Sequence, residues 1–143
     1  MIKVLFLCTG NSCRSQMAEG WAKKLLPGVL DAYSAGTRPG MVDPRAIKVM
    51  GEAGVDISGH RSKSVEEFRD TRFDLVVTVC DKARESCPLW FGKAQKLHQS
   101  FEDPPFLAKD TKTEGEALAH YRKVRDEIKD FILKLPDIMK EGR

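Results

Sequence analysis

Near its start the chain reads Ile2-Lys-Val-Leu-Phe-Leu7-Cys8-Thr-Gly-Asn-Ser-Cys13-Arg14-Ser15, an apolar run followed at once by a short polar loop. The run has the length of a buried parallel strand, and the residues after Ser15 have the apolar spacing of a helix. Gly10 and Asn11 tolerate left-handed backbone angles, so we expect this loop to turn its N–H groups inward. A strand, a tight loop and a helix in this order indicate an α/β fold.

A cysteine and an arginine give this loop the chemistry of an oxyanion site. The helix beginning near Ser15 places roughly half a positive charge at its N-terminus, and Arg14 adds a full charge with a bidentate fork. We expect them to lower the pKa of Cys8 from about 8.5 to between about 3.5 and 7.5. The alternative is a turn with an incidental buried cysteine. The residues expected to bind the oxyanion are Thr9, Gly10, Asn11, Ser12, Cys13, Arg14 and Ser15.

Two other kinds of site fit less well. A nucleotide-binding loop of the Walker type is excluded because Gly10 is not followed by Gly-Lys-Ser/Thr. Zinc sites favour tighter cysteine pairs than Cys8 with Cys13 or Cys80 with Cys87. The histidines, which stand apart from both pairs, are His60, His98 and His120. We therefore expect neither a metal nor a cofactor.

Strand-like runs alternate with helical signals along the rest of the chain. The expected strands are 2–7, 30–35, 74–79 and, more weakly, 96–99. The expected helices begin near Ser15, at Pro44 after Asp43, after Ser64 and after Thr113. The residues expected to end helices are Gly28, Gly54 and Pro136. We predict a three-layer α/β/α fold with a four-stranded parallel sheet, formed by one domain over residues 1–143.

Composition excludes several classes of protein. With 41% hydrophobic and 31% charged residues the chain has the make-up of a globular domain, and its apolar runs are too short to cross a membrane. The N-terminus lacks a signal-peptide pattern, so we expect a cytoplasmic monomer. In that compartment the four cysteines do not form a structural disulfide framework. The net charge of +3 mildly favours anionic ligands, but the cations are scattered, so we expect no nucleic-acid partner.

A second cysteine repeats the setting of the first. Cys80 directly follows the run 74–79, as Cys8 follows its own strand. If these parallel strands are neighbours, about 4.8 Å apart, both thiols leave the sheet at the same carboxyl edge. Cys80 could then reach a species held on Cys8. The alternative is that Cys80 is a small core residue.

Cys87 could take over a disulfide from Cys80 by thiol–disulfide exchange. A helix over residues 81–86 would hold the two cysteines about 10 Å apart, beyond the limit of about 7 Å between the Cα atoms of a disulfide. We therefore hypothesise that residues 80 to about 93 are ordered when reduced and loop out when oxidised. Equal hydrogen-exchange protection of this segment in both redox states would contradict the hypothesis.

Asp103 precedes Pro104 in a loop after the last expected strand. A carboxylic acid at this edge of the sheet could protonate a leaving oxygen. The alternative is an ordinary Asp-Pro turn.

Together these motifs resemble the thioredoxin-coupled arsenate reductases, which are built on the low-molecular-weight tyrosine phosphatase fold. The matching segments are 7–22, 33–36, 55–58, 74–78, 101–104 and 122–128, with the Cys80/Cys87 pair. The resemblance implies that Cys8 attacks arsenate, that Cys80 attacks the Cys8–arsenic adduct and releases arsenite, and that Cys87 takes over the disulfide for thioredoxin to reduce. It also implies an oxyanion-binding role for Arg14, support of the nucleophile by Ser15 and general acid catalysis by Asp103.

The chain departs from the family at one place. Some relatives hold a potassium ion near the loop, and Asn11, Glu19 and Ser34 match its ligands, but Lys63 stands where an acid would be. We expect the Lys63 ammonium group to replace the ion.

Two other functions stay open. A tyrosine phosphatase would use Cys8, Arg14 and Asp103 and leave the later cysteines idle. Such phosphatases usually have an aromatic residue next to the Asp-Pro pair, whereas Pro105 stands there in this chain, which favours a small inorganic substrate with residual phosphatase activity. A thiol redox or metal sensor would turn over no substrate. Cys13, inside the loop, is expected to be a structural thiol.

Overall fold

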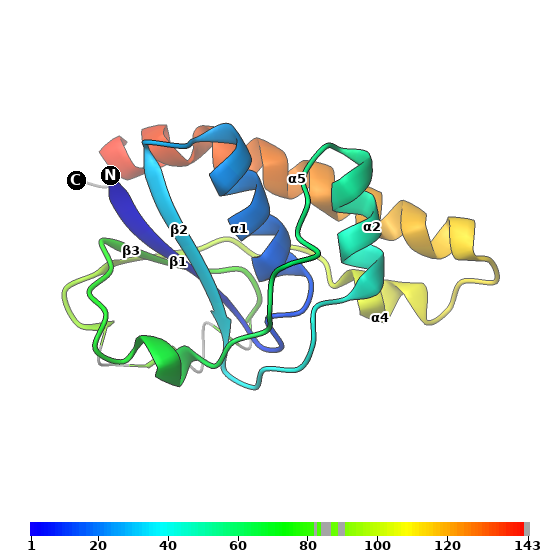
Figure 1. Ribbon diagram of the computed structural model, residues 1–143, viewed down its shortest axis with the longest axis horizontal. Coiled ribbons are helices and arrows are strands. Elements are labelled where there is room, and N and C mark those ends of the chain that lie inside the picture. The colour runs from blue at the N-terminus through cyan, green and yellow to red at the C-terminus, as the bar shows by residue number, and fades with distance from the viewer. Residues whose placement is uncertain (82, 84–86, 89–90, 142–143) are drawn as a thin grey trace.

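The computed structural model describes residues 1–81, 83, 87–88 and 91–141. Its four strands form one parallel sheet in the order β2-β1-β3-β4 (Figure 1). The predicted four-stranded parallel sheet is thereby confirmed. The elements are β1 (Ile2–Cys8), α1 (Arg14–Leu25), β2 (Leu30–Gly36), α2 (Pro44–Glu52), η1 (Val65–Phe68), β3 (Leu75–Thr78), β4 (Gln95–His98), α4 (Pro104–Ala108) and α5 (Glu114–Glu141).

Successive side chains of a strand point to opposite faces of the sheet, and different elements cover these two faces. Ser34 on β2 donates a hydrogen bond of 2.6 Å to Glu19 of α1, and α5 packs against α1 and α2 beyond it (Figure 1). The neighbouring residue Tyr33 faces the other way and meets the ring of Phe68 in η1, with 5.8 Å between centroids. The predicted three-layer α/β/α arrangement is confirmed, with the short helix η1 on the second face.

The predicted caps begin the helices. The carboxylate of Asp43 accepts a hydrogen bond of 2.9 Å from the N–H of Arg45 at the start of α2. The hydroxyl of Thr113 accepts one of 3.1 Å from the N–H of Glu116 at the start of α5. Ser64 caps η1 in the same way, although η1 is only a short 3₁₀ turn. Local capping chemistry therefore located these helix starts correctly.

The helix ends agree with the prediction only in part. Gly28 and Gly54 follow α1 and α2 with φ angles of 81° and 82°, which glycine adopts at little cost. The prediction that Pro136 ends the last helix was wrong, because α5 continues to Glu141. An internal proline costs about 3 kcal/mol, and burying a large apolar side chain contributes about 1.5–3 kcal/mol, so the packing of this turn offsets the lost hydrogen bond. The buried residues around the proline are Ile132, Leu135 and Met139.

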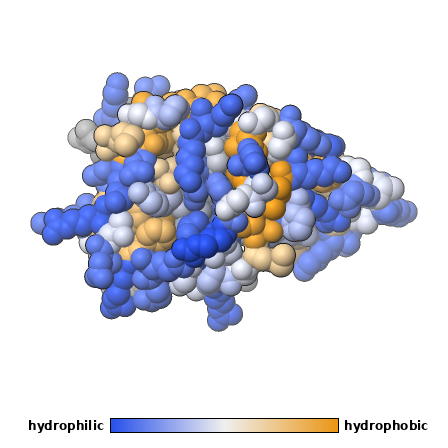
Figure 2. Space-filling view, viewed as in Figure 1, coloured by the Kyte–Doolittle hydropathy of each residue, from blue (hydrophilic) through white to orange (hydrophobic). Residues whose placement is uncertain are grey.

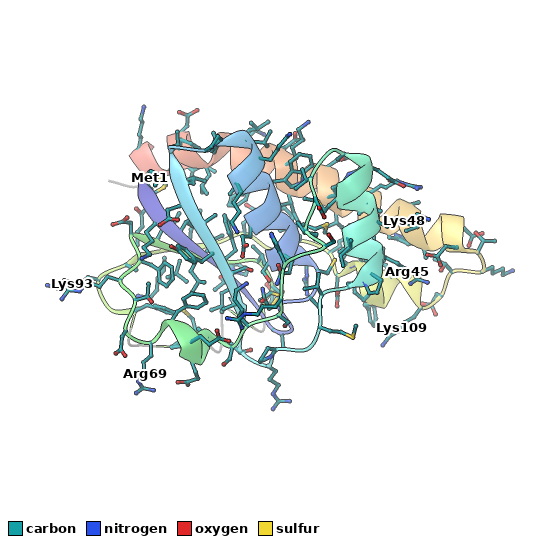
Figure 3. All side chains as sticks on the ribbon, in the orientation of Figure 1. Met1, Arg45, Lys48, Arg69, Lys93 and Lys109 are labelled. Atoms are coloured by element: carbon teal, nitrogen blue, oxygen red, sulfur yellow. The ribbon has the colours of Figure 1, made fainter. Side chains whose placement is uncertain are left out.

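The surface is mixed in character. Hydrophilic side chains cover most of the face in Figure 2, with hydrophobic ones gathered in the region of α1 and α2. In Figure 3, Arg69 and Lys93 lie at one end of the molecule, and Arg45, Lys48 and Lys109 lie toward the other, so these cations do not form one continuous stripe. Among the described residues, no helix is long and apolar enough to cross a membrane.

Candidate active site

The loop between β1 and α1 is held by hydrogen bonds to its carbonyl groups. The carbonyls of Cys8, Thr9, Gly10 and Ser12 accept hydrogen bonds of 2.8–3.2 Å from the N–H groups of Thr37, Arg38, Gly40 and Asp43. Carbonyls that point outward let the loop direct N–H groups inward, and the N–H of Asn11 lies 3.2 Å from Cys8 Sγ. Asn11 has the predicted left-handed conformation, with φ 48°. The same expectation for Gly10 was wrong, because one left-handed residue completes the turn.

Cys8 is buried among hydrogen-bond donors. Its Sγ lies 2.8 Å from the hydroxyl of Ser15, and that hydroxyl accepts a hydrogen bond of 2.8 Å from the side-chain amide of Asn11. Because the amide occupies the Ser15 oxygen as a donor, the Ser15 hydrogen is free to point at the sulfur. The pair therefore forms a fixed donor to a Cys8 thiolate.

The expected lowering of the Cys8 pKa is wrong for this geometry. Burial raises the pKa of the Cys8 thiol above its ordinary value, and the hydrogen bonds from Ser15 and Asn11 offset this only in part. The guanidinium of Arg14 is engaged elsewhere, donating 2.9 Å to the carbonyl of Phe101 and lying 3.8 Å from Asp103. Cys8 is therefore a thiol at neutral pH in this arrangement.

This raised pKa predicts the pH dependence of Cys8 alkylation. Thiolate forms as pH rises through the pKa, so alkylation of Cys8 by iodoacetamide should reach half its maximal rate at a higher pH than alkylation of a free cysteine does. Ser15→Ala removes a hydrogen bond that lowers the pKa, so its profile should move to still higher pH. Peptide mapping by mass spectrometry isolates the Cys8 signal, and a Ser15→Ala profile at lower pH would contradict the prediction.

Cys8 and Cys80 open into the same pocket, of about 420 Å³. β1 and β3 are neighbours, with Leu7 paired to Thr78, so both cysteines leave the sheet at one edge. The hydroxyl of Thr9 lies 3.5 Å from Cys80 Sγ and joins the two segments. Cys80 is also buried within the hydrophobic core. The residues that line the pocket are Cys8, Thr9, Gly10, Ser12, Cys13, Arg14, Cys80, Asp81, Asp103 and Pro105.

Asp103 stands at the mouth of this pocket. It is the N-cap residue of α4, but its carboxylate makes no capping hydrogen bond and lies 3.8 Å from the Arg14 guanidinium. Its side chain is 46% exposed, so it can exchange protons with solvent. Pro105 lines the pocket, whereas the Phe106 side chain is exposed, and the described lining residues include no aromatic ring. The pocket therefore suits a small anion better than an aryl ester.

The other two cysteines differ in position, because Cys13 lines the same pocket whereas Cys87 does not. Cys13 is buried, and its pKa is raised well above the ordinary value by burial and then by the charge of Asp43. Cys87 is half-buried outside the pocket lining, and burial raises its pKa although Lys96 lowers it. The structure therefore does not bring Cys87 to Cys8. Of the segment hypothesised to loop out, residues 82, 84–86 and 89–90 lie outside the described residues.

Lys63 lies close to two of the three residues matched to potassium ligands. Its Nζ is 3.5 Å from Glu19 Oε1 and 3.5 Å from the hydroxyl of Ser34. Burial would raise the pKa of Glu19, but hydrogen bonds from Lys23 and Ser34 and the charge of Lys63 hold that pKa below its ordinary value. Asn11 instead accepts the backbone N–H of Lys63 at 2.8 Å. Two ammonium groups therefore neutralise this carboxylate, that of Lys23 at 2.6 Å and that of Lys63 at 3.5 Å.

We therefore expect turnover to be independent of potassium. Rates in potassium and sodium salts of equal ionic strength should agree, because the ammonium groups of Lys23 and Lys63 already lie beside the Glu19 carboxylate. Lys63→Asp should create a response to potassium, since it exchanges the ammonium group for a ligand. Stimulation of the unmodified protein by potassium over sodium would refute the prediction.

Sequence patterns did not indicate Gln16, which holds the loop from behind. This buried amide donates to the backbone carbonyl and the side-chain oxygen of Asn11, at 3.2 and 3.0 Å, and to the carbonyl of Arg61 at 2.9 Å. His60 Nδ1 lies 2.9 Å from its oxygen. The available signal was a polar residue on the inner face of the first helix, and by itself it could not name these partners.

The chain resembles known proteins over nearly its whole length. The chain matches the low molecular weight phosphotyrosine protein phosphatase family over residues 3–142. The chain belongs to this family. It is 47% identical over 125 residues to an arsenate reductase of Halalkalibacterium halodurans, covering 87% of this chain and 88% of the relative. It is 44% identical over 134 residues to an arsenate reductase of Bacillus licheniformis, covering 94% of each.

A solved structure of a family member has the same architecture. It is described as an arsenate reductase in the phosphate binding state, with TM-score 0.80 and 37% identity, covering 94% of this chain and 96% of that one. The resemblance to arsenate reductases of this phosphatase fold is thereby confirmed.

Proposed function

We propose that this protein reduces arsenate to arsenite through a relay of three thiols, Cys8, Cys80 and Cys87, recycled by thioredoxin. The observation that carries the proposal is that two cysteines from adjacent strands open into one pocket beside Arg14. A phosphatase has no use for the second thiol. The relatives from Halalkalibacterium halodurans and Bacillus licheniformis, named arsenate reductases, support the same substrate.

In the first step Cys8 attacks arsenic. The dianionic substrate takes the proton of the Cys8 thiol, which the raised pKa of Cys8 otherwise holds in place. A sulfur–arsenic bond forms, an arsenic–oxygen bond breaks, and Asp103 protonates the departing oxygen, which leaves as water. Loop N–H groups and the Arg14 guanidinium stabilise the negative oxygens throughout. The proposed oxyanion-binding set is 9–15, within which the side chains of Asn11 and Ser15 support Cys8.

In the second step Cys80 attacks the sulfur of the Cys8–arsenic adduct. The Cys80 thiol loses its proton, a Cys8–Cys80 disulfide forms and the sulfur–arsenic bond breaks. Its electron pair goes to arsenic, which falls from the +5 to the +3 state and leaves as arsenite. The Thr9 hydroxyl lies 3.5 Å from Cys80 Sγ and can donate a hydrogen bond to the Cys80 thiolate once that has formed.

In the third step Cys87 attacks Cys80 and frees Cys8. A Cys80–Cys87 disulfide replaces the first one, and a thioredoxin dithiol then reduces it by exchange. Cys87 is the more accessible of the pair, since it is half-buried whereas Cys80 is buried. Thioredoxin has to reach one sulfur of the Cys80–Cys87 disulfide, and that of Cys87 is the more accessible one.

One coupled assay tests the proposal. Arsenate-dependent oxidation of NADPH, measured with thioredoxin and thioredoxin reductase, should be continuous for the unmodified protein. Cys80→Ser and Cys87→Ser should both abolish it, and Cys87→Ser should still release one arsenite per protein. NADPH oxidation that persists in Cys87→Ser would exclude the relay.

A phosphatase is the second candidate, because Cys8, Arg14 and Asp103 line one pocket and the family contains phosphatases. It predicts efficient hydrolysis of aryl phosphates without arsenate-dependent NADPH oxidation. A thiol sensor predicts one stoichiometric reaction with oxidant or arsenite and no continuous turnover. The same assay therefore separates the three functions.

We further propose that residues 1–143 act as one domain, as a monomer, in the cytoplasm. The described residues from Val4 to Met139 share one hydrophobic core, which supports a single folding unit. All four cysteines are free thiols, which agrees with a reducing compartment.

A further inference from the structure

We propose that His98 is a positioning residue for Cys80, which it keeps directed at Cys8 by joining the end of the sheet to Asp81. The inference deepens the proposed function, because it concerns the second thiol of the relay. It rests on a set of three side chains, Thr78, His98 and Asp81, which we call the His98 bridge.

Both nitrogens of the His98 ring are engaged. Nδ1 lies 2.7 Å from the hydroxyl of Thr78, and Nε2 lies 3.0 Å from Asp81 Oδ1. A carboxylate only accepts hydrogen bonds, so Nε2 carries a hydrogen, and in the neutral ring Nδ1 must accept from the Thr78 hydroxyl. Protonation of the ring would still leave Nε2–H on Asp81. The bridge therefore holds Asp81 in either charge state.

The bridge spans the point where the backbone leaves the sheet. Thr78 and His98 are paired at the last register position of β3 and β4. The N–H of Val79 still donates 3.0 Å to the carbonyl of Leu7, beyond the end of β3. Cys80 follows, and Asp81 is helical. Residues on both sides of Cys80 are therefore tied to the sheet, one by the ladder and one by His98.

The two anchors differ in burial. Thr78 is buried and the His98 side chain is 21% exposed, whereas the Asp81 side chain is 79% exposed. The buried end of the bridge, Thr78, thus belongs to the core, and its exposed end, Asp81, directly follows Cys80 in the chain. Asp81 also lines the pocket of Cys8, so the bridge ends at the site itself. Without the hydrogen bond from His98, the solvent-exposed side chain of Asp81 would have little energetic preference for one orientation.

The expected consequence is a defect confined to the second step. Loss of the bridge frees the backbone after Cys80, so the thiol spends less time within reach of the Cys8–arsenic adduct. Arsenate binding uses the loop and Arg14 and should not change. Because Asp81 is 79% exposed, solvent weakens its bond to His98, so loss of this bond in His98→Ala should lower kcat a few-fold while the KM for arsenate stays the same.

Two pairs of variants test this. His98→Ala should lower the rate of arsenite release in a single turnover a few-fold, whereas His120→Ala, a histidine on α5, should not. Asp81→Ala should also lower this rate, and Asp81→Asn should lose less of it than Asp81→Ala, because an amide oxygen still accepts from Nε2–H. The double variant His98→Ala/Asp81→Ala should be no slower than either single variant. An equal loss in Asp81→Asn and Asp81→Ala, or an unchanged rate in His98→Ala, would overturn the inference.

If the unmodified protein releases no arsenite, the proposed function fails, and the bridge is tested without substrate. Iodoacetamide should then label Cys80 several-fold faster in His98→Ala and Asp81→Ala than in Asp81→Asn, His120→Ala or the unmodified protein. Mass spectrometry of the Cys80 peptide measures it. Equal labelling in all five proteins would overturn the inference independently of the reaction.

Discussion

Replacing Cys80 with serine is expected to abolish continuous arsenate reduction, with a loss of about a thousandfold or more, while the Cys8 chemistry survives. A serine hydroxyl fits the volume of the thiol but cannot form a disulfide, so the Cys8–arsenic adduct has no intramolecular route to arsenite. The hydrogen bonds of Cys8 are kept in this variant, because they come from Ser15 and Asn11.

The same variant contains its own control. Hydrolysis of p-nitrophenyl phosphate uses Cys8, Arg14 and Asp103, so any residual phosphatase activity should be equal in Cys80→Ser and the unmodified protein. Arsenite release and phosphate release are measured side by side on one preparation. A parallel loss of both activities would mean that Cys80 serves the pocket as a core residue, and the relay would have to be abandoned.

The strands and the loop could be predicted because their signals are local. β1, β2, β3 and β4 each lie within one or two residues of the expected runs. The signal is strongest for β1 and β3, whose largely apolar sequences are typical of buried parallel strands. The meeting of Cys8 and Cys80 could be predicted for the same reason. Each directly follows a strand run, and parallel strands end at one edge of the sheet.

What failed depended on the interior of the folded molecule. The pKa of Cys8 rises because burial outweighs the hydrogen bonds, and the depth of burial is not visible in a loop motif. α5 passes through Pro136 because packing around the proline outweighs a local breaking signal. Local sequence rules therefore predicted the features that backbone conformation determines, but they did not predict the features that burial determines.

The supporting residues could not be named from the sequence at all. Gln16 contacts Asn11 and Arg61, and His98 contacts Thr78 and Asp81, and most of these pairs are far apart in the chain. The position of a single histidine or glutamine in the sequence does not indicate which residues it contacts in the fold. Only the assembled sheet edge brings these groups together, so this layer of the site required the structure.

Gly36 packs against the backbone of the loop that follows Cys8. Replacing Gly36 with alanine should reduce arsenate reduction and phosphatase activity together. Gly36 ends β2 beside Cys8. A Cβ atom there would lie 2.5 Å from the carbonyl oxygen of Thr9 and 2.9 Å from the backbone nitrogen of Asn11. Both contacts are with backbone atoms, so no side chain can swing away to relieve them.

The loop itself must therefore move, by roughly 0.5–1 Å to restore ordinary contact distances, and displacement on that scale costs about a hundredfold in a positioned active site. We expect kcat/KM to fall about a hundredfold for arsenate and for p-nitrophenyl phosphate alike. Gly59→Ala, where an added Cβ meets nothing within 4 Å, is the matched control. A Gly36→Ala protein with normal kinetics would show that the loop tolerates displacement, and then the inward N–H groups could not be the main source of oxyanion binding.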